Sequence, residues 1–474
     1  MDRRPRIGLL ETPIARLAFI RPELLAALAG LFLFVQSALE RLTFLPGPIE
    51  RLISSSDEGV LVVLLAWVAA RAWWRSERLR LPAVLWPLAV MLLVALAGTI
   101  LNRVPPDQAA LGTFLALKAP LWLVVGANLE VSPRDLRRYA TLIGALFAAA
   151  AIIGVVQLLG LDLPWTTHLR RSGDIAATSI FNQHTVFGSA MAVGVGLAVA
   201  GLLDPPSRRR AVVLLAATVI GGLISTTRRL LVSLPLSALA LIRSLRLPIV
   251  TPARVARGRA VLSRRSAQIL LALAVVASVG IAAVVVAPRV VHLVGATWDE
   301  YVINASTRDR YELYGGAFRL VADSPVVGRG PGTYGSWASV VYKSPVFGQV
   351  GVHLKVGLRT GAPYASLLAE FGLLGAAAFM AFVALLYRAL IRVARRTGEL
   401  AAAIAGGAAF MVVDMVIESV VHVSFVDSFA AFFVFVGAGL ALGAMAQSQA
   451  AAPSSPAGID SPSSPASDGA TSAS

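Results

Sequence analysis

The chain has 474 residues, of which 57% are hydrophobic and only 14% are charged, and its mean hydropathy is +0.75. Soluble globular proteins carry about 25% charged residues, so this composition excludes an ordinary soluble protein and indicates a polytopic membrane protein. The formal net charge is +16, but the arginines gather in short runs between apolar segments, which argues against a nucleic-acid partner. The chain has no cysteine, which excludes disulfides and thiolate metal sites.

Apolar runs recur along the whole chain, and we count twelve that are candidates for crossing about 30 Å of hydrocarbon as helices. Backbone polar groups find no water inside a bilayer, so helices are the expected spanning elements. In chain order the candidates cover 23–40, 59–74, 81–101, 109–128, 139–160, 181–203, 210–227, 230–245, 267–288, 364–390, 399–421 and 424–446.

The arginine runs orient these helices. If residue 1 is cytoplasmic, every dense arginine cluster falls in a connection on the cytoplasmic side, as expected of such loops, and both termini are then cytoplasmic. The expected organisation is a cytoplasmic leader (1–22), helices one to nine (23–288), a large external loop (289–363), helices ten to twelve (364–446) and a disordered cytoplasmic tail (447–474).

Two adjacent arginines, Arg228 and Arg229, interrupt the apolar stretch ATVIGGLISTTRRLLVSLPLSALA (217–240). An arginine at the centre of a bilayer costs roughly 2.5–3.5 kcal/mol even on a lenient scale, so the pair is expected at a membrane surface or in a site. The predicted topology puts both residues at the outer surface, where guanidinium groups suit the oxygens of a diphosphate. The alternative is that both side chains merely snorkel from helix ends.

The external loop is the longest predicted connection, and such a connection is more often functional than filler. It contains Arg308 and Arg310, which could close over the same anion, and the stretch SPVVGRGPGTYG (324–335). Its glycines predict a tight turn with positive φ, which could place backbone N–H groups near a ligand. No strand precedes this stretch in an α/β unit, so a nucleotide-binding fingerprint is not expected.

The remaining polar candidates are histidines and one acidic pair. All of the histidines are predicted at external helix ends or in external loops, where any could act as a general base, although an isolated histidine is more often structural: His168, His184, His292, His353 and His422. Asp414 and Glu418 lie four residues apart on one predicted helix face; they could couple an ion, but we favour a role in orienting nearby arginines. No metal-ligand spacing or nucleophile motif is present, so no cofactor is expected.

Four segments, in this order, resemble the O-antigen ligase and O-antigen polymerase superfamily of bacterial envelope glycosyltransferases. They are SIFNQHTVFGSAMAVG (179–194), STTRRLLVSLPL (225–236), RDRYELYGGAFRLVADSPVVGRGPGTYG (308–335) and PYASLLAEFGLLGAAAF (363–379). The resemblance covers about residues 170–440 and implies an all-α, GT-C-like membrane fold of about twelve helices. It also implies transfer of a glycan from an undecaprenyl-diphosphate-linked donor, without a metal.

The resemblance also assigns residues. It implies that Arg228 and Arg310 hold the diphosphate of the donor. Gly361 and Ala362 stand where many members have His-Asn, so either His353 supplies the base from another direction or the chain uses no histidine base. The further candidates for substrate binding are Arg229, as an auxiliary charge, and Arg308, Tyr311, Tyr364 and Glu370.

The sequence therefore predicts a glycosyltransferase of the bacterial inner membrane that ligates or polymerises a glycan on its outer face. Its expected partners are the polyprenyl-diphosphate-linked donor, a glycan, lipid or protein acceptor, and membrane lipids. Two alternatives remain at this stage: a transporter or lipid-linked glycan flippase, and an inactive scaffold of an envelope polysaccharide assembly complex. The absence of a visible internal repeat gives no support to the inverted-repeat design of many transporters.

Overall fold

The structure is a computed structural model that describes residues 22–39, 53, 56–161, 169–171, 174–181, 183–227, 229–246, 306–354, 360–396, 400–420, 422 and 428–450. Among these residues the fold is helical except for a two-stranded antiparallel ribbon, β1 (Leu169–Arg171) and β2 (Asp174–Ala176), in which Leu169 is opposite Ala176. The predicted all-α class is therefore confirmed for the described part of the chain.

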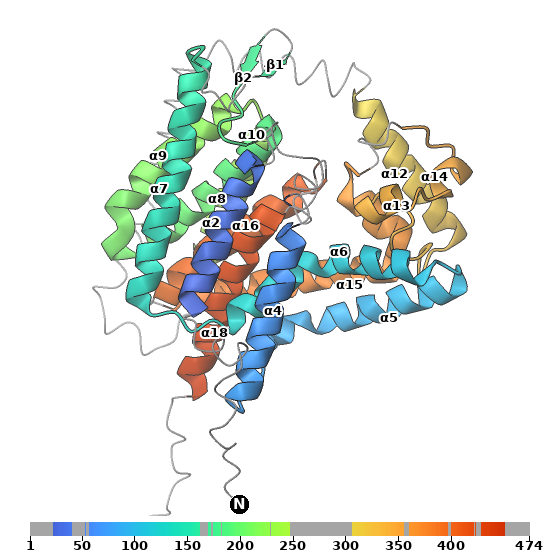
Figure 1. Cartoon of the computed structure of the whole chain (residues 1–474), viewed down its shortest axis with the longest axis horizontal. Helices are drawn as coiled ribbons and strands as arrows, with labels where there is room; N and C mark the ends of the chain where they lie inside the picture. The colour runs from blue at the N-terminus through green and yellow to red at the C-terminus, as the bar shows by residue number, and fades with distance from the viewer. Residues whose placement is uncertain are drawn as a thin grey trace, which may run out of the picture.

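The principal helices follow the predicted apolar runs (Figure 1). They are α2 (Pro22–Leu39), α4 (Ser56–Trp74), α5 (Trp86–Leu101), α6 (Pro106–Ala127), α7 (Pro133–Leu158), α8 (His184–Leu203), α9 (Arg208–Ile224), α10 (Leu230–Arg246), α15 (Pro363–Ala394), α16 (Leu400–Glu418), α17 (Ser428–Ala431) and α18 (Gly437–Ala450). A π-helical turn, Phe432–Val436, joins α17 to α18, and short 3-10 turns, Ala83–Leu85 and Pro205–Ser207, precede α5 and α9.

Seven helical segments of the described chain are long and apolar enough to cross a membrane: Ala83–Leu101, Pro106–Ala127, Pro133–Leu158, His184–Leu203, Pro363–Ala394, Leu400–Glu418 and Ser428–Gln447. The predicted runs in α2, α4, α9 and α10 form helices that are shorter or more charged. The predicted ninth run, 267–288, lies outside the described residues, as do residues 1–21 of the leader. Twelve spans and a GT-C-like class stay predictions. The tail does not begin where expected, because α18 continues to Ala450.

The helix boundaries have local causes. The start of α7 is a clear case, because the side chain of Ser132 accepts a hydrogen bond from the backbone N–H of Asp135 at 3.1 Å, and Pro133 occupies the first helical position. A second case is Gly372 in α15, whose φ of 64° and ψ of −169° break the helical path and kink the helix.

Aromatic side chains fill the core between several helices. Phe429 lies at the centre, with its ring 5.9 Å from that of Phe34, 5.9 Å from Phe147 and 5.1 Å from Phe433. Elsewhere small residues allow close helix contact: a Cβ on Gly407 of α16 would lie 2.6 Å from the carbonyl oxygen of Gly196 of α8. The central helices α8 and α16 are accordingly held without room for larger side chains at this contact.

A largely buried ionic cluster, which was not predicted from the sequence, joins α4 to α6. Lys118 Nζ lies 3.1 Å from Asp57 Oδ2 and 2.9 Å from Glu58 Oε1, and the Lys118 side chain is only 4% exposed. Ionisable groups inside a membrane protein are costly, so the lysine and its two carboxylates must be held together by mutual attraction.

The described part of the loop that was predicted to be external (289–363) is folded. It contains α12 (Ser306–Asp323), α13 (Trp337–Val341) and α14 (Val346–Gln349), which lie at one end of the helices α5, α6 and α15 (Figure 1). These short helices have a small core of their own, which includes Leu313, Leu320, Tyr334, Phe347 and Val352. We call this end of the molecule the loop end; α15 begins here and α16 ends here.

Candidate functional site

Arg229 is buried at the loop end and is fully engaged with neighbouring helices. Its Nε lies 2.9 Å from Glu418 Oε1 at the end of α16, and its Nη2 donates to Ser189 Oγ at 2.6 Å and to the Thr185 carbonyl at 3.1 Å, both on α8. The two ion-paired side chains are 10% and 2% exposed. The expectation that Glu418 orients an arginine is confirmed, and Arg229 connects the starts of α8 and α10 to the end of α16.

The turn that presents Arg229 is built by the Ser/Thr run before it. Thr226 has a φ of 55°, Ser225 Oγ accepts from the Thr227 N–H at 3.2 Å, and Thr227 Oγ1 donates to the His184 carbonyl at 3.1 Å. Hydroxyl groups that bond locally to the backbone favour such a turn over continued helix. Arg228, the preferred diphosphate ligand of the sequence analysis, lies outside the described residues.

His422 lies just beyond the end of α16, within electrostatic reach of two arginines from distant parts of the chain. Burial and the positive charges of Arg229 and Arg310 lower the pKa of His422 well below its usual value. Both effects disfavour the imidazolium, so the imidazole of His422 is neutral near pH 7. The structure therefore places one of the predicted histidines near Arg310, the predicted loop arginine.

Two tyrosines fasten the loop end to α16. Tyr314 of α12 donates its hydroxyl to the Val420 carbonyl at 2.8 Å, and Tyr364 of α15 donates to the Val416 carbonyl at 2.7 Å. The Val416 carbonyl belongs to the last turn of α16, where it lacks an intrahelical partner, and Val420 lies two residues beyond that helix, so the two hydroxyls bond backbone groups that the helix itself does not satisfy. Burial raises the pKa of Tyr314, and the charge of Arg310 partly opposes that effect. Tyr364, predicted to bind substrate, is used here as a structural donor.

Arg310 and Tyr314 are one turn apart on α12, so they share a face of that helix. We call the group formed by Arg229, Arg310, Tyr314, Tyr364, Glu418 and His422 the α16 terminus site. It combines cationic groups, a neutral imidazole and the carbonyl end of a helix. A cationic group is favoured beside that end, and the arginines together favour an anionic ligand.

The predicted substrate-binding residue Glu370 is buried instead, with 1% exposure. Its Oε1 accepts from the Tyr334 N–H at 2.9 Å and from Ser336 Oγ at 2.6 Å. A buried carboxylate needs such donors, and here they come from the end of the glycine-rich loop. Glu370 therefore positions that loop against α15.

The glycine-rich loop (324–335) has the positive φ angles that were predicted, but several of its N–H groups bond to protein and not to a ligand. Gly328, Gly330, Gly332 and Gly335 all have positive φ, which confirms the predicted turns. The loop binds protein, however: Arg329 N donates to the Ala369 carbonyl at 2.8 Å, Gly330 N to the Glu370 carbonyl at 2.9 Å, and Tyr334 N to Glu370 itself. Those three N–H groups are not available to a phosphate.

The other predicted residues lie away from the α16 terminus site or are not described in full. His353 is exposed between the buried Val352 and Leu354, and Tyr311 is 70% exposed on α12. Arg308 lies in the first turn of α12, but its side chain is outside the described part of the structure. The structure thus brings Arg229, Arg310 and Tyr364 of the predicted set together. Tyr314 was not among the predicted residues, although its spacing of four from Arg310 in the sequence places the two on one helix face.

The fold and site define a helical protein with several helices that could cross a membrane and a cationic group at one end of them. Compared with models of known protein families the chain matches none, and no curated protein matches it significantly.

Proposed function

We propose that the protein is a metal-independent membrane glycosyltransferase of the O-antigen ligase or polymerase type. It transfers or polymerises a glycan from an undecaprenyl-diphosphate-linked donor on the outer face of the bacterial inner membrane, and the acceptor is a glycan, a lipid or a protein. The observation that carries this proposal is that the positive charges of Arg229 and Arg310 both act on His422, just beyond the end of α16 and beside the folded loop that contains α12–α14.

The proposal gives the arginines two different roles. Arg229 already donates to Glu418, Ser189 and Thr185, so it acts as a positioning residue that holds the site together. Arg310 and Arg228 are the proposed diphosphate ligands. Arg310 is half-buried on α12, where a guanidinium can offer a bidentate fork to phosphate oxygens.

The proposed base is His422 in place of His353. The acceptor hydroxyl gives its proton to His422 as its oxygen forms a bond to the anomeric carbon of the donor sugar. The bond between that carbon and the diphosphate oxygen breaks, and the electron pair leaves with undecaprenyl diphosphate. The arginines stabilise the negative charge that grows on the leaving group, while His422 later returns its proton to water.

The test uses full-length protein in proteoliposomes, a radiolabelled lipid-linked glycan isolated from the same cells, and an acceptor fraction. Arg228→Ala and Arg310→Ala are each expected to lower transfer about 100-fold, as loss of a group that stabilises transition-state charge does. Arg319→Ala, an exposed arginine on the same helix α12, is the matched control and should keep normal transfer. Normal product from both the Arg228 and the Arg310 variants would refute the mechanism.

A transporter or lipid-linked glycan flippase is the second candidate, and the buried cluster of Lys118, Asp57 and Glu58 favours it. Transporters place charged groups inside the bundle along a substrate or proton path. The same proteoliposomes separate the two candidates, because a flippase would move the labelled lipid-linked glycan across the bilayer without forming a new glycosidic bond. Neither product nor movement would point to an inactive scaffold.

A further inference from the structure

A cavity of about 460 Å³ lies at the other end of the bundle from the α16 terminus site, and the proposed function does not use it. Its wall comes from α2, α7, α8, α9, α16, α18 and the π-helical turn, and most of the wall is apolar. The volume lies in the range of about 300–1,000 Å³ that is usual for binding sites of small organic molecules. Small residues such as Gly144 and Ala148 of α7 line this space between the helices.

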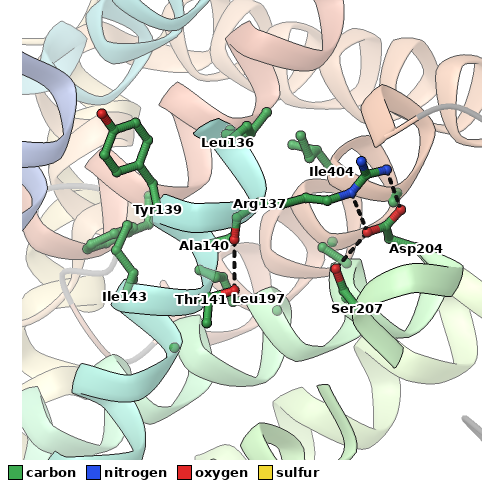
Figure 2. A pocket seen from close by; sticks show the side chains of 18 of the residues that line it. Leu136, Arg137, Tyr139, Ala140, Thr141, Ile143, Leu197, Asp204, Ser207 and Ile404 are labelled. Carbon is green, nitrogen blue, oxygen red and sulfur yellow. Dashed lines mark hydrogen bonds and ion pairs between the residues drawn. The ribbon is translucent and has the colours of Figure 1, made fainter. Parts of the chain in front are cut away.

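The cavity has a polar end and an apolar end. The polar end is formed where α7 begins and α8 passes into α9, and Figure 2 shows Arg137 directed at Asp204 there. Arg137 Nε lies 3.0 Å from Asp204 Oδ2, and its Nη2 donates to Oδ1 at 3.1 Å. The apolar end is lined by Met411, Phe432 and other side chains of the core. This distribution suits an amphiphile rather than water or a uniformly polar ligand.

The length of the cavity matches one half of a bilayer. The wall contributed by α7 extends from Leu136 to Ala148, which is about 18 Å along a helix axis. Half of the hydrocarbon core of a membrane is about 15 Å thick. The cavity also reaches the outside of the bundle, because one of its lining residues, Val213 of α9, is 67% exposed. A lipid chain from one leaflet could therefore enter sideways and fill it.

The positive charge at the polar end of the cavity favours a lipid with an anionic head group. The charge of Arg137 is offset by Asp204, whereas Arg210 is exposed and donates from Nη1 to the hydroxyl of Thr141 at 3.3 Å, which leaves its positive charge in place. A phosphate at the mouth would be attracted to that charge. We propose that the cavity binds one acyl chain of an anionic phospholipid whose phosphate contacts Arg210.

The test places full-length protein in nanodiscs with phosphatidylglycerol that carries a photoreactive group at the end of one acyl chain. The expected result is labelling of residues at the apolar end, such as Met411 and Phe432, above the labelling of exposed lipid-facing residues such as Leu93 of α5. Phosphatidylcholine with the same chain should label the cavity about fivefold less, the ratio given by one favourable arginine contact. Labelling confined to exposed helix faces would overturn the proposal.

Three variants sharpen the experiment. Ala148→Phe fills the cavity and should abolish labelling of the residues that line it. Circular dichroism and size-exclusion chromatography check that the variant folds like the wild type. Arg210→Ala leaves the core unchanged and should remove the preference for phosphatidylglycerol, whereas Arg209→Ala, an exposed neighbour that does not line the cavity, should keep it. A preference unchanged by Arg210→Ala would contradict the head-group assignment. If the cavity is labelled only after residues 1–20 are deleted, that segment and not a lipid is the occupant of the cavity in the full-length protein. This result would overturn the proposal.

Discussion

Arg229 and Glu418 form a buried ion pair across the loop end, with 2.9 Å between Nε and Oε1. The two residues are separated by 189 positions in the chain, and the pair joins the turn after α9 to the end of α16. The carboxylate fixes the arginine, and the fixed positive charge adds to the effect of burial, which lowers the pKa of His422. An arginine that first looks like a ligand is thereby a part of the framework around the proposed ligand site.

Removing one partner of this pair should lower the free energy of unfolding much more than removing both. Arg229→Met leaves the Glu418 carboxylate buried without its cation and is expected to cost about 3–5 kcal/mol of unfolding free energy. The double variant Arg229→Met/Glu418→Leu should recover a large part of that loss. Denaturant unfolding in detergent, followed by circular dichroism, measures the cycle, and additive losses in the double variant would show that the pair is not coupled.

The stability of the protein should depend on pH through His422. Its pKa is lowered in the folded state, so below about pH 6.5 the unfolded chain binds a proton that the folded chain does not. Stability is therefore highest above that pH and is lost as the pH falls, by up to about 1.4 kcal/mol per pH unit. His422→Gln should reduce the pH dependence of the unfolding midpoint between pH 5 and 8, whereas the exposed control His353→Gln should keep the dependence of the wild type. The same pH dependence in both variants and the wild type would count against a lowered pKa of His422.

The two tyrosine hydroxyls should contribute to the attachment of the loop. Tyr314→Phe and Tyr364→Phe each remove one hydrogen bond to the end of α16 and are expected to cost about 1 kcal/mol. Limited proteolysis should then cut the loop that contains α12–α14 faster than in the wild type. Tyr311→Phe is the matched control, because Tyr311 is 70% exposed on the same helix, and a similar effect of this change would rule out a specific role of the bonded hydroxyls.

Gly328 should tolerate no side chain. It has a φ of 67°, and an added Cβ would lie 2.5 Å from the backbone nitrogen of Gly372 in the kink of α15. Gly328→Ala combines backbone strain with a backbone clash and is expected to cost about 3 kcal/mol. Gly351 has a similar φ of 65° but open space around it, so Gly351→Ala should cost only about 1 kcal/mol. Thermal unfolding of both variants compares the two effects, and equal losses would remove the clash as a cause.

Much of the helical framework was predictable from local sequence. The predicted runs coincide with helices throughout the described residues, because segment length and hydropathy are local properties and a helix satisfies its own backbone groups. The positive φ of the glycine-rich loop was predictable for a related reason, since only glycine adopts that backbone without steric cost.

The composition and the order of apolar and arginine-rich segments alone determined that this is a helical chain of membrane type. The tertiary structure decided what the polar residues do: Arg229 and Glu370 became framework residues, Tyr364 a helix-end donor and His422 the imidazole beside two arginines. It also revealed the cavity beside Arg137 and the partners of Lys118. The physical reason is that burial and charge pairing depend on which distant segments of the chain contact one another. Local hydropathy carries no information about those contacts.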